Sequence, residues 1–597
     1  MTDCSDVAET AGVHCERMKP VTVNGLFGWL HAHPEHEHGD VAVLICQALA
    51  EDTFDSHHAL RVLADDFAAA GYPAMRFNYP DTGDSADIAD TDHWVAEHWA
   101  AWQQSVHDAA DWLRGVTGAR RLVFCGLRIG ATLATLAAER RDDVAALILL
   151  APVLRGRSYV RQLWIEARLQ NDGILARSER LDLHELHLSS ETLHLISQVD
   201  LRQANLPAAH PIAIFSQSDS KLLSECVDEW TTRGANVTCS GFDGLEPMLR
   251  DYGDCEHVPI DSSAVIEWTR RAIPAQPNRS LVAATPTSVT LRLPECVETP
   301  LSFGPDKRLF GVLCRPDKKA GEIAVIIVNC GRVPHYGIGR FGVEFARRLA
   351  TLGIASLRID FAGLGDSLGP AGRENLRTTI FETDRVADIG AAIDILERLG
   401  YRHFAVHGIC SGAYHAFQGA LADARVNMLL LINMPFFFWR HGDTFTMAMQ
   451  RTYSLSHYLL KLTNRRGWRQ ILKGGANHRA ILRAQFERIR KYLRTTGSRF
   501  TGEQFSQSRA ETFAQDAMVT LSHRHAKTIF LFAPDEVGFY AVERTFGRRG
   551  AGLRFFKGAS MRVVPELDHD LTSSQARRIA SDLMVDFLVS SPFIARR

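Results

Sequence analysis

Three short segments of this chain occur twice, in the same order and at a nearly constant distance. The pairs are Gly25–Leu30 with Arg308–Leu313, Gly83–Ser85 with Gly365–Ser367, and Gly126–Gly130 with Gly408–Gly412. The first pair is 283 positions apart (310 − 27), and the other two are 282 apart (365 − 83 and 408 − 126). So steady an offset over about a hundred residues requires matched elements and loops, which predicts two copies of one fold.

A proline-rich stretch separates the copies. Five prolines lie between Ile273 and Pro300 among Ser, Thr and Ala, a composition that disfavours helix and suits an extended connector. We therefore expect a tail at 1–20, a first domain at 21–273, a linker at 274–300 and a second domain at 301–597. Two domains also suit the length, because 597 residues exceed what a single hydrophobic core usually organises.

Composition excludes several classes of protein. Lys and Arg number 67 against 69 acidic residues, so no bulk field attracts nucleic acid. The N-terminus lacks the basic and apolar regions of a secretory signal, and the longest apolar stretch, 428–439, is interrupted and shorter than the ~20 residues of a membrane span. The 11 cysteines show no CxxC pairs or zinc spacing. These features predict a cytoplasmic protein without a membrane span, a disulfide framework or a metal site.

Within each copy, short β-branched runs alternate with amphipathic stretches. This pattern is typical of a mostly parallel sheet covered by helices on both faces. In the second copy we expect strands at 324–328, 355–359, 404–407 and 528–532, and helices at 341–352 and 384–399.

The strand expected at 404–407 runs into the sequence Gly-Ile-Cys-Ser-Gly, which is typical of a nucleophile elbow. In this motif small residues permit a sharp turn that exposes the central side chain, here Cys410, at a helix N-terminus. The helix dipole there favours a thiolate. The N–H of Ser411 is a natural oxyanion donor, and a second is expected from Gly331 or Arg332 after an earlier strand. Ser411 is a weaker nucleophile candidate, because it lies one place past the apex.

The partners of a nucleophile elbow follow it in the order acid, then histidine. Asp535 comes after the strand at 528–532, and His569 lies in a loop before the C-terminal helix. His569 would accept the thiol proton of Cys410 and Asp535 would orient the imidazole, although Asp568 and Asp570 could compete for that role. Together these features predict two tandem α/β-hydrolase domains.

The first copy has arginine at the corresponding apex. Arg128 stays protonated in proteins and cannot act as a nucleophile, although Asp219 and His257 occupy partner-like positions. This domain is therefore expected to be a pseudoenzyme. Arg128 could hold a carboxylate or phosphate at the helix N-terminus, or it could pair with Asp219 in a vestigial site.

The segment from apex to acid is 125 residues long in the second copy (535 − 410) and 91 in the first (219 − 128). The additional residues fall where α/β hydrolases carry a lid, so we expect a larger helical lid at about 436–525. Its first part is aromatic and its later part, 465–494, is basic. The basic run is either a solvated face or a recognition surface for an acidic acyl carrier.

The quoted motifs resemble a known pair of families. The first copy, with GLRIGATLA and arginine at the apex, resembles the type 2 exosortase A system-associated hydrolases. The second copy, with VNCGRVPHYGIGRF, FAGLGDS and GICSGA, resembles type 1. The resemblance implies the S33-like branch of the α/β-hydrolase superfamily, a cysteine nucleophile, and bacterial exopolysaccharide gene clusters that also encode acyl-carrier proteins and acyl-activating enzymes.

The sequence thus predicts a cysteine-dependent esterase or thioesterase that works through an acyl-enzyme, with no cofactor. The substrate would be an acyl ester or thioester, with an acyl-carrier protein or coenzyme A as candidate carriers. Two alternatives remain open: an acyltransferase using the same intermediate, and a non-catalytic scaffold of a biosynthetic assembly.

Overall fold

The computed structural model describes most of the chain. The described residues are 18–33, 39–88, 97–170, 180–206, 210–217, 220–241, 248, 261–276, 289–317, 321–369, 380–381, 385–440, 443, 448, 500–591 and 593. Contacts divide the chain into a first unit of Met1–Ile380, Ala387–Phe404 and Asp570–Arg597, and a second unit of Phe381–Val386 and Ala405–His569. None of the helices in these described ranges is long and apolar enough to cross a membrane.

The first copy forms an eight-stranded sheet in the order β1-β2-β4-β3-β5-β6-β9-β10. Its strands are β1 (Met18–Val23), β2 (Leu26–His31), β3 (Val41–Cys46), β4 (Ala74–Phe77), β5 (Arg121–Leu127), β6 (Val144–Leu150), β9 (Pro211–Phe215) and β10 (Asn236–Ser240). Strand β2 pairs antiparallel with both neighbours, whereas the strands from β4 to β10 pair in parallel. This order is that of the α/β-hydrolase fold.

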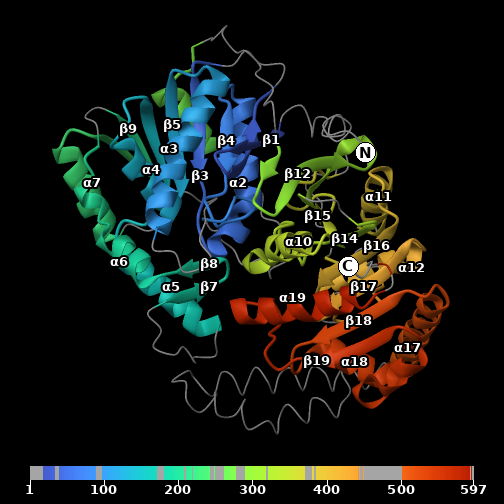
Figure 1. Ribbon diagram of the computed structural model, residues 1–597. Helices are drawn as coiled ribbons and strands as arrows, with labels where there is room; N and C mark the ends of the chain where they lie inside the picture. Colours follow the sequence, from blue (N-terminus) through green and yellow to red (C-terminus); the bar gives the residue numbers. More distant parts are fainter. Residues whose placement is uncertain are drawn as a thin grey trace, which may run out of the picture. The chain divides into compact units, whose positions relative to one another are not determined.

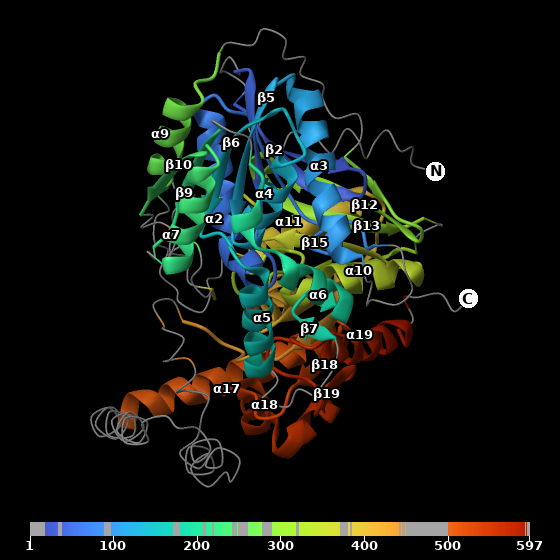
Figure 2. The ribbon, with the colours of Figure 1, turned by 90° about the vertical axis from the view of Figure 1, so that its left-hand side faces the viewer.

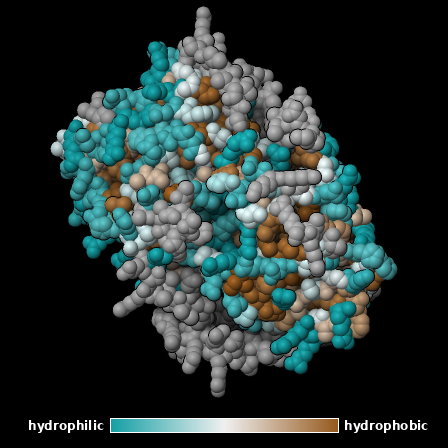
Figure 3. Space-filling model, in the orientation of Figure 1, coloured by the Kyte–Doolittle hydropathy of each residue, from teal (hydrophilic) through white to brown (hydrophobic). Residues whose placement is uncertain are grey.

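Helices cover both faces of this sheet (Figures 1 and 2). One face packs against α3 (His98–Thr117), α4 (Ile129–Ala138) and α7 (Lys221–Thr232), and the other against α2 (Glu51–Ala69) and α9 (Ser263–Ala272). Because both faces are buried, β3 is apolar throughout and all its residues are buried. The surface over α3 and α7 is mainly hydrophilic in Figure 3, as expected for the outer faces of covering helices.

A cap interrupts the first copy between β6 and β9. It consists of α5 (Gly156–Gln170), a hairpin of β7 (Leu181–Leu183) and β8 (Leu186–Leu188), and α6 (Ser190–Gln198).

The second copy repeats the same order. In the first unit it contributes β11 (Leu291–Arg292), β12 (Cys296–Phe303), β13 (Leu309–Pro316), β15 (Ala355–Asp360) and β14 (Ile323–Ile327), hydrogen-bonded in that order, with α10 (Phe341–Thr351), α11 (Arg385–Arg398) and α19 (Ser574–Val589). The second unit contributes β16 (His403–Ile409), β17 (Val426–Ile432), β18 (Lys527–Phe532) and β19 (Ala559–Val563), with α12 (Ser411–Ala422), α17 (Phe500–His523) and α18 (Val537–Phe546).

The expected strands and helices of the second copy are confirmed, each within about two residues. The predicted fold class, two α/β domains with mostly parallel sheets, is confirmed as well. The predicted lid falls largely on residues outside the described ranges, as do residues 277–288 of the predicted linker, and all of the basic run at 465–494 lies outside them.

The two Gly-Asp-Ser turns have the same internal geometry. Ser85 Oγ accepts from the N–H of Phe27 at 2.8 Å, and Ser367 Oγ accepts from the N–H of Phe310 at 2.8 Å. Each turn begins with a glycine at positive φ, 48° at Gly83 and 49° at its counterpart. A Cβ at Gly83 would lie 2.4 Å from the side chain of Asn78, so the close turn requires glycine.

Within the first unit, each of these turns places its aspartate against the other copy. Asp84 accepts from Nη2 of Arg358 at 3.0 Å, and Asp366 is bonded to Nη2 of Arg76. The two arginines are 282 positions apart (358 − 76), as are the two aspartates (366 − 84), so the contacts are related by the repeat. An exchange of equivalent contacts is the property of an isologous, two-fold interface.

An apolar cluster accompanies the exchanged ion pairs. It contains Met18, Phe27, Trp29, Phe310 and Val312, with the rings of Trp29 and Phe310 4.6 Å apart between centroids. Four of these residues are again repeat equivalents, Phe27 with Phe310 and Trp29 with Val312. The copies therefore meet through the same surface of each, and side chains of both signs are buried there together with apolar ones.

His335 links both copies at the centre of this network. Its Nδ1 lies 2.7 Å from Asp360 Oδ2 and its Nε2 lies 2.6 Å from Asp84 Oδ2. Burial alone would lower the pKa of His335, but the two carboxylates outweigh burial and raise the pKa to about 10. The imidazole is thus a buried cation that holds two carboxylates.

Because of His335, the free energy of unfolding should fall as the pH rises in the alkaline range. Because its pKa is raised from 6.5 to about 10, its contribution is complete below pH 6.5 and is lost as the pH rises through 10. We expect His335→Gln to unfold at a lower temperature than the native chain at pH 6, by a difference that shrinks towards pH 10. Thermal unfolding followed by circular dichroism across this pH range measures both curves, and parallel curves would contradict the assignment.

Candidate active site

The elbow of the second copy has the strained backbone that the motif predicts. Strand β16 ends at Ile409 and α12 begins at Ser411, with Cys410 between them at φ 50° and ψ −115°. Positive φ is costly for a residue with a Cβ, so the surrounding structure must impose it. The N–H of Cys410 donates to the carbonyl of Ile432 on β17 at 2.9 Å, which fixes the apex to the sheet.

Glycine at the start of this elbow is a steric requirement. A Cβ at Gly408 would lie 2.2 Å from the carbonyl carbon of Gly412 and 2.5 Å from the nitrogen of Ala413. The strand and the helix therefore approach too closely for any side chain at Gly408. Cys410 itself is half-buried, and Ser411 is a buried first residue of α12. The thiol thus lies at a helix N-terminus, where a thiolate is favoured.

The carboxylate that contacts His569 is Glu536. Nδ1 of His569 lies 3.0 Å from both Oε1 and Oε2 of Glu536, whose side chain is 13% exposed. A carboxylate at Nδ1 fixes the tautomer in which Nε2 can accept a proton. This pair, rather than the predicted one, has the geometry of an acid that orients a base.

The predicted acid, Asp535, is the residue before Glu536. Asp535 accepts instead from the hydroxyl of Tyr540 at 3.3 Å. Its backbone is left-handed, with φ 64°, whereas Glu536 is extended at the N-cap of α18. The turn after β18 therefore directs the two adjacent carboxylates to different neighbours, which flanking sequence alone does not reveal.

Asn433 is a positioning residue that the sequence analysis missed. Its side-chain amide donates to the carbonyls of Asp568 at 3.0 Å and His569 at 2.9 Å, and its Oδ1 accepts from the N–H of Ala533 at 2.8 Å. Asn433 is fully buried and follows β17 with φ 49°. It therefore ties the histidine loop to the end of β18. The available signal was a polar residue inside the apolar run 428–439.

The predicted second oxyanion donors lie in the first unit. Gly331 and Arg332 form a turn after β14, and Gly331 has φ 57°. Both are half-buried.

The elbow of the first copy matches that of the second. Arg128 has φ 54° and ψ −119°, and its N–H donates to the carbonyl of Leu150 at 2.9 Å. A Cβ at Gly130 would lie 2.2 Å from the carbonyl oxygens of Cys46 and Gln47, so this turn also requires glycine. The apex backbone is thus nearly the same in both copies, whereas its side chain differs.

The side chain of Arg128 has partners within its own domain. Nε lies 3.2 Å from Asp52 Oδ2, and Nη2 donates to Gln162 Oε1 at 2.9 Å. Asp219 and His257, the expected vestigial partners, lie outside the described residues.

One group in the described part of the chain brings ligand-type atoms close enough for a metal ion. His335, Asp360 and Asp366 offer such atoms within 4.8 Å of one another. Both imidazole nitrogens of His335 already face carboxylates, and Asp366 is bonded to Arg76. These residues form an ion-pair network. The imidazolium of His335 donates a hydrogen bond from each ring nitrogen and has no lone pair for a metal.

Comparisons with known proteins find similarity at the level of single domains. No family model and no curated protein matches the chain. Among solved structures, a serine hydrolase without a lid from Xanthomonas campestris is 18% identical and covers 44% of this chain and 98% of its own, with a TM-score of 0.28. Est1E from Butyrivibrio proteoclasticus, with ferulic acid bound, is 13% identical over 42% and 98%, with a TM-score of 0.32. An esterase from Pyrococcus furiosus is 13% identical over 43% and 90%, with a TM-score of 0.28.

The class of the chain, a tandem α/β-hydrolase fold, is defined by the strand order of both copies and by their two strained elbows.

Of the neighbouring carboxylates Asp535 and Glu536, Glu536 contacts His569, so the two should differ in their effect on Cys410. We expect Glu536→Gln to slow alkylation of Cys410 by iodoacetamide at neutral pH by about tenfold, the effect of roughly one unit in the pKa of the thiol–imidazole pair. Peptide mass spectrometry follows Cys410 among the other cysteines. The matched control Asp535→Asn should leave the rate unchanged, and equal slowing by both variants would contradict the pairing.

Removal of the Asn433 amide should loosen the histidine loop. Asn433→Ala leaves two carbonyls and one N–H without their partner, so we expect the free energy of unfolding to fall by about 1–3 kcal/mol. Urea unfolding measures the change, with Asn205→Ala at an exposed position as the control. An unchanged midpoint in Asn433→Ala would show that water replaces the amide.

Proposed function

We propose that the second copy is a cysteine-dependent acyl hydrolase, an esterase or thioesterase. The observation that carries the proposal is the strained elbow that presents Cys410 at a helix N-terminus, in a chain that supplies the pair Glu536 and His569 in the order this fold requires. The replacement of the nucleophile by Arg128 leaves the first copy without this chemistry.

In the proposed mechanism Cys410 attacks the carbonyl carbon of an acyl ester or thioester. His569 takes the thiol proton, and Glu536 stabilises the resulting imidazolium through Nδ1. The carbonyl π electrons move to oxygen, and the N–H of Ser411 donates to that oxyanion.

The tetrahedral intermediate then collapses. The bond to the leaving alcohol or thiol breaks, the leaving group takes the proton from His569, and the acyl group remains on Cys410 as a thioester. Water, deprotonated by His569, releases the carboxylic acid and restores the thiol. Transfer to another acceptor would use the same intermediate, so an acyltransferase differs from this proposal only in the second step.

The resemblance to exosortase-associated hydrolases favours a substrate carried by an acyl-carrier protein or coenzyme A. It also favours a cytoplasmic site of action, where such carriers are found. The first copy would act as a scaffold for the second, because the exchanged ion pairs of the Gly-Asp-Ser turns join it to the first half of the second copy.

Intact-mass spectrometry of the full chain tests the acyl-enzyme. Incubation with a panel of acyl thioesters and activated esters should add one acyl mass to the native protein and to Ser411→Ala, which keeps its backbone N–H. Cys410→Ala should carry no adduct, and free acid should accumulate with the native protein.

The other outcomes are equally informative. An adduct that is lost in Ser411→Ala and kept in Cys410→Ala would identify Ser411, and not Cys410, as the nucleophile. Transfer to an added alcohol or amine faster than to water would identify an acyltransferase. Folded protein with no adduct from any member of the panel would favour the non-catalytic scaffold.

A further inference from the structure

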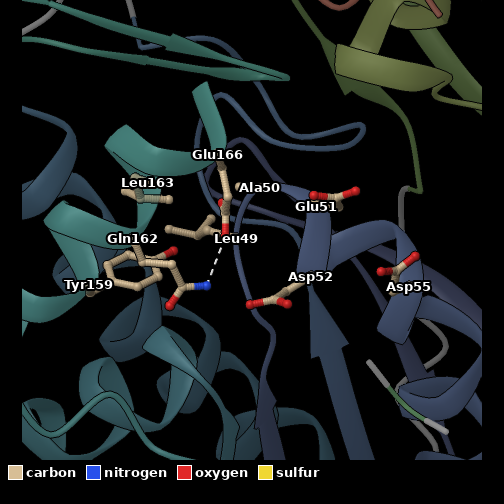
Figure 4. A pocket seen from close by; sticks show the side chains of 9 residues that line it. All are labelled: Leu49, Ala50, Glu51, Asp52, Asp55, Tyr159, Gln162, Leu163 and Glu166. Carbon is tan, nitrogen blue, oxygen red and sulfur yellow. Dashed lines mark hydrogen bonds between the residues drawn. The ribbon is translucent and has the colours of Figure 1, made fainter. Parts of the chain in front are cut away.

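A cavity of about 260 Å³ opens at the elbow of the first copy. Two elements line it, the start of α2 with the loop before it, and one side of α5 (Figure 4). The lining residues are Leu49, Ala50, Glu51, Asp52, Asp55, Tyr159, Gln162, Leu163 and Glu166. At roughly 30 Å³ for each water in the liquid, the cavity has room for a small organic molecule.

Arg128, at the apex of the elbow, lies beside this cavity, because two residues that line the cavity bind its side chain. Asp52 and Gln162, which bind the guanidinium of Arg128, are both lining residues. The cavity therefore lies at the position where the second copy has its candidate nucleophile, although the reaction chemistry is lost here.

The charge of the lining selects the sign of a ligand. Four of the nine lining residues are carboxylic acids, and the nearby guanidinium already has an acid and an amide as partners. Burial raises the pKa of Glu166, and the neighbouring Asp52 carboxylate raises it further. An anion would meet these carboxylates, which favours the other sign of ligand over the alternative of Arg128 as a carboxylate or phosphate site. A cation would be stabilised by them.

Tyr159 provides an independent sign of a missing partner. The residue is 4% exposed, it lines the cavity, and its hydroxyl has no hydrogen-bond partner among the described residues. Figure 4 shows its ring beside Gln162, on the α5 side of the cavity, with Asp52 on the α2 side. A buried phenol without a partner is unfavourable, and a ligand in the cavity could supply one.

The cation that fits is organic rather than a metal ion. Among the described residues, the lining carboxylates do not form a group whose oxygens lie within 4.8 Å of one another, as a shared metal would need. An ammonium group has three donors and can reach separated acceptors. The apolar side chains of Leu49 and Leu163, both almost fully buried, could contact an attached alkyl chain.

We propose that the first copy binds a small primary ammonium compound in this cavity. The ammonium donates to the carboxylates of Asp52 and Glu166 and to the hydroxyl oxygen of Tyr159, and its alkyl chain lies against Leu49 and Leu163. The site is independent of the chemistry proposed for the second copy.

Titration of the full chain with n-butylammonium, followed by saturation-transfer NMR, tests this site. We expect saturable binding, weakened about tenfold or more in Glu166→Gln and in Tyr159→Phe, since each variant removes a hydrogen bond to a charged group. Butyltrimethylammonium has the same charge without N–H donors and should bind more weakly than n-butylammonium. Glu191→Gln, on the exposed side of α6, and Cys410→Ala should bind as the native chain does.

Several outcomes would overturn the proposal. They are the absence of saturable binding by n-butylammonium, undiminished binding in Glu166→Gln, and displacement of n-butylammonium by phosphate or butyrate. Circular dichroism establishes that each variant is folded, and Glu166→Gln, at a half-buried position, decides the matter if Tyr159→Phe does not fold.

Discussion

The exchanged ion pairs between the two Gly-Asp-Ser turns are the constraint on which the first unit depends. Asp84 and Asp366 are buried, each faces an arginine from the other copy, and His335 adds a second cation at Asp84. Buried charges are stabilising only when paired, and loss of one partner costs about 3–5 kcal/mol. The turns, the arginines on β4 and β15, and the position of His335 must therefore all be maintained together. This explains why the Gly-Asp-Ser motif persists in both copies, although only one has a candidate nucleophile.

The two copies share the backbone of the elbow but differ in the side chain at its apex. Both elbows have nearly the same backbone, with φ 54° at Arg128 and 50° at Cys410, because close packing around Gly126 and Gly408 fixes the turn. The side chain at the apex is not fixed by that packing. In the first copy Arg128 binds Asp52 and Gln162 beside a cavity. In the second copy Cys410 is followed along the chain by the contacting pair Glu536 and His569. One backbone thus supports a binding site in one copy and nucleophilic chemistry in the other, by proposal in both cases.

Predictions from the sequence succeeded where a pattern has a local physical cause. The strands, the helices and the elbow followed from apolar periodicity and from glycines that permit a tight turn. Predictions were incomplete where neighbours in space decide. Asp535 and Glu536 are adjacent in the chain, and only the contact between Nδ1 of His569 and the Glu536 carboxylate shows which of them lies beside the histidine. Asn433 lies 136 positions before His569, and its role depends on a hydrogen bond that no local pattern encodes.

The sequence by itself determined that the chain folds as two copies of one α/β architecture, and that one copy has a cysteine where the other has an arginine. Both facts follow from repeat spacing and residue identity, which need no knowledge of distant contacts. The tertiary structure alone decided which carboxylate contacts His569, how Asp84 and Asp366 join the copies, and that Tyr159 lines a cavity rich in acids. The physical reason is that hydrogen bonds, ion pairs and burial depend on distances between residues far apart in the chain, and those distances exist only once the sheets have formed.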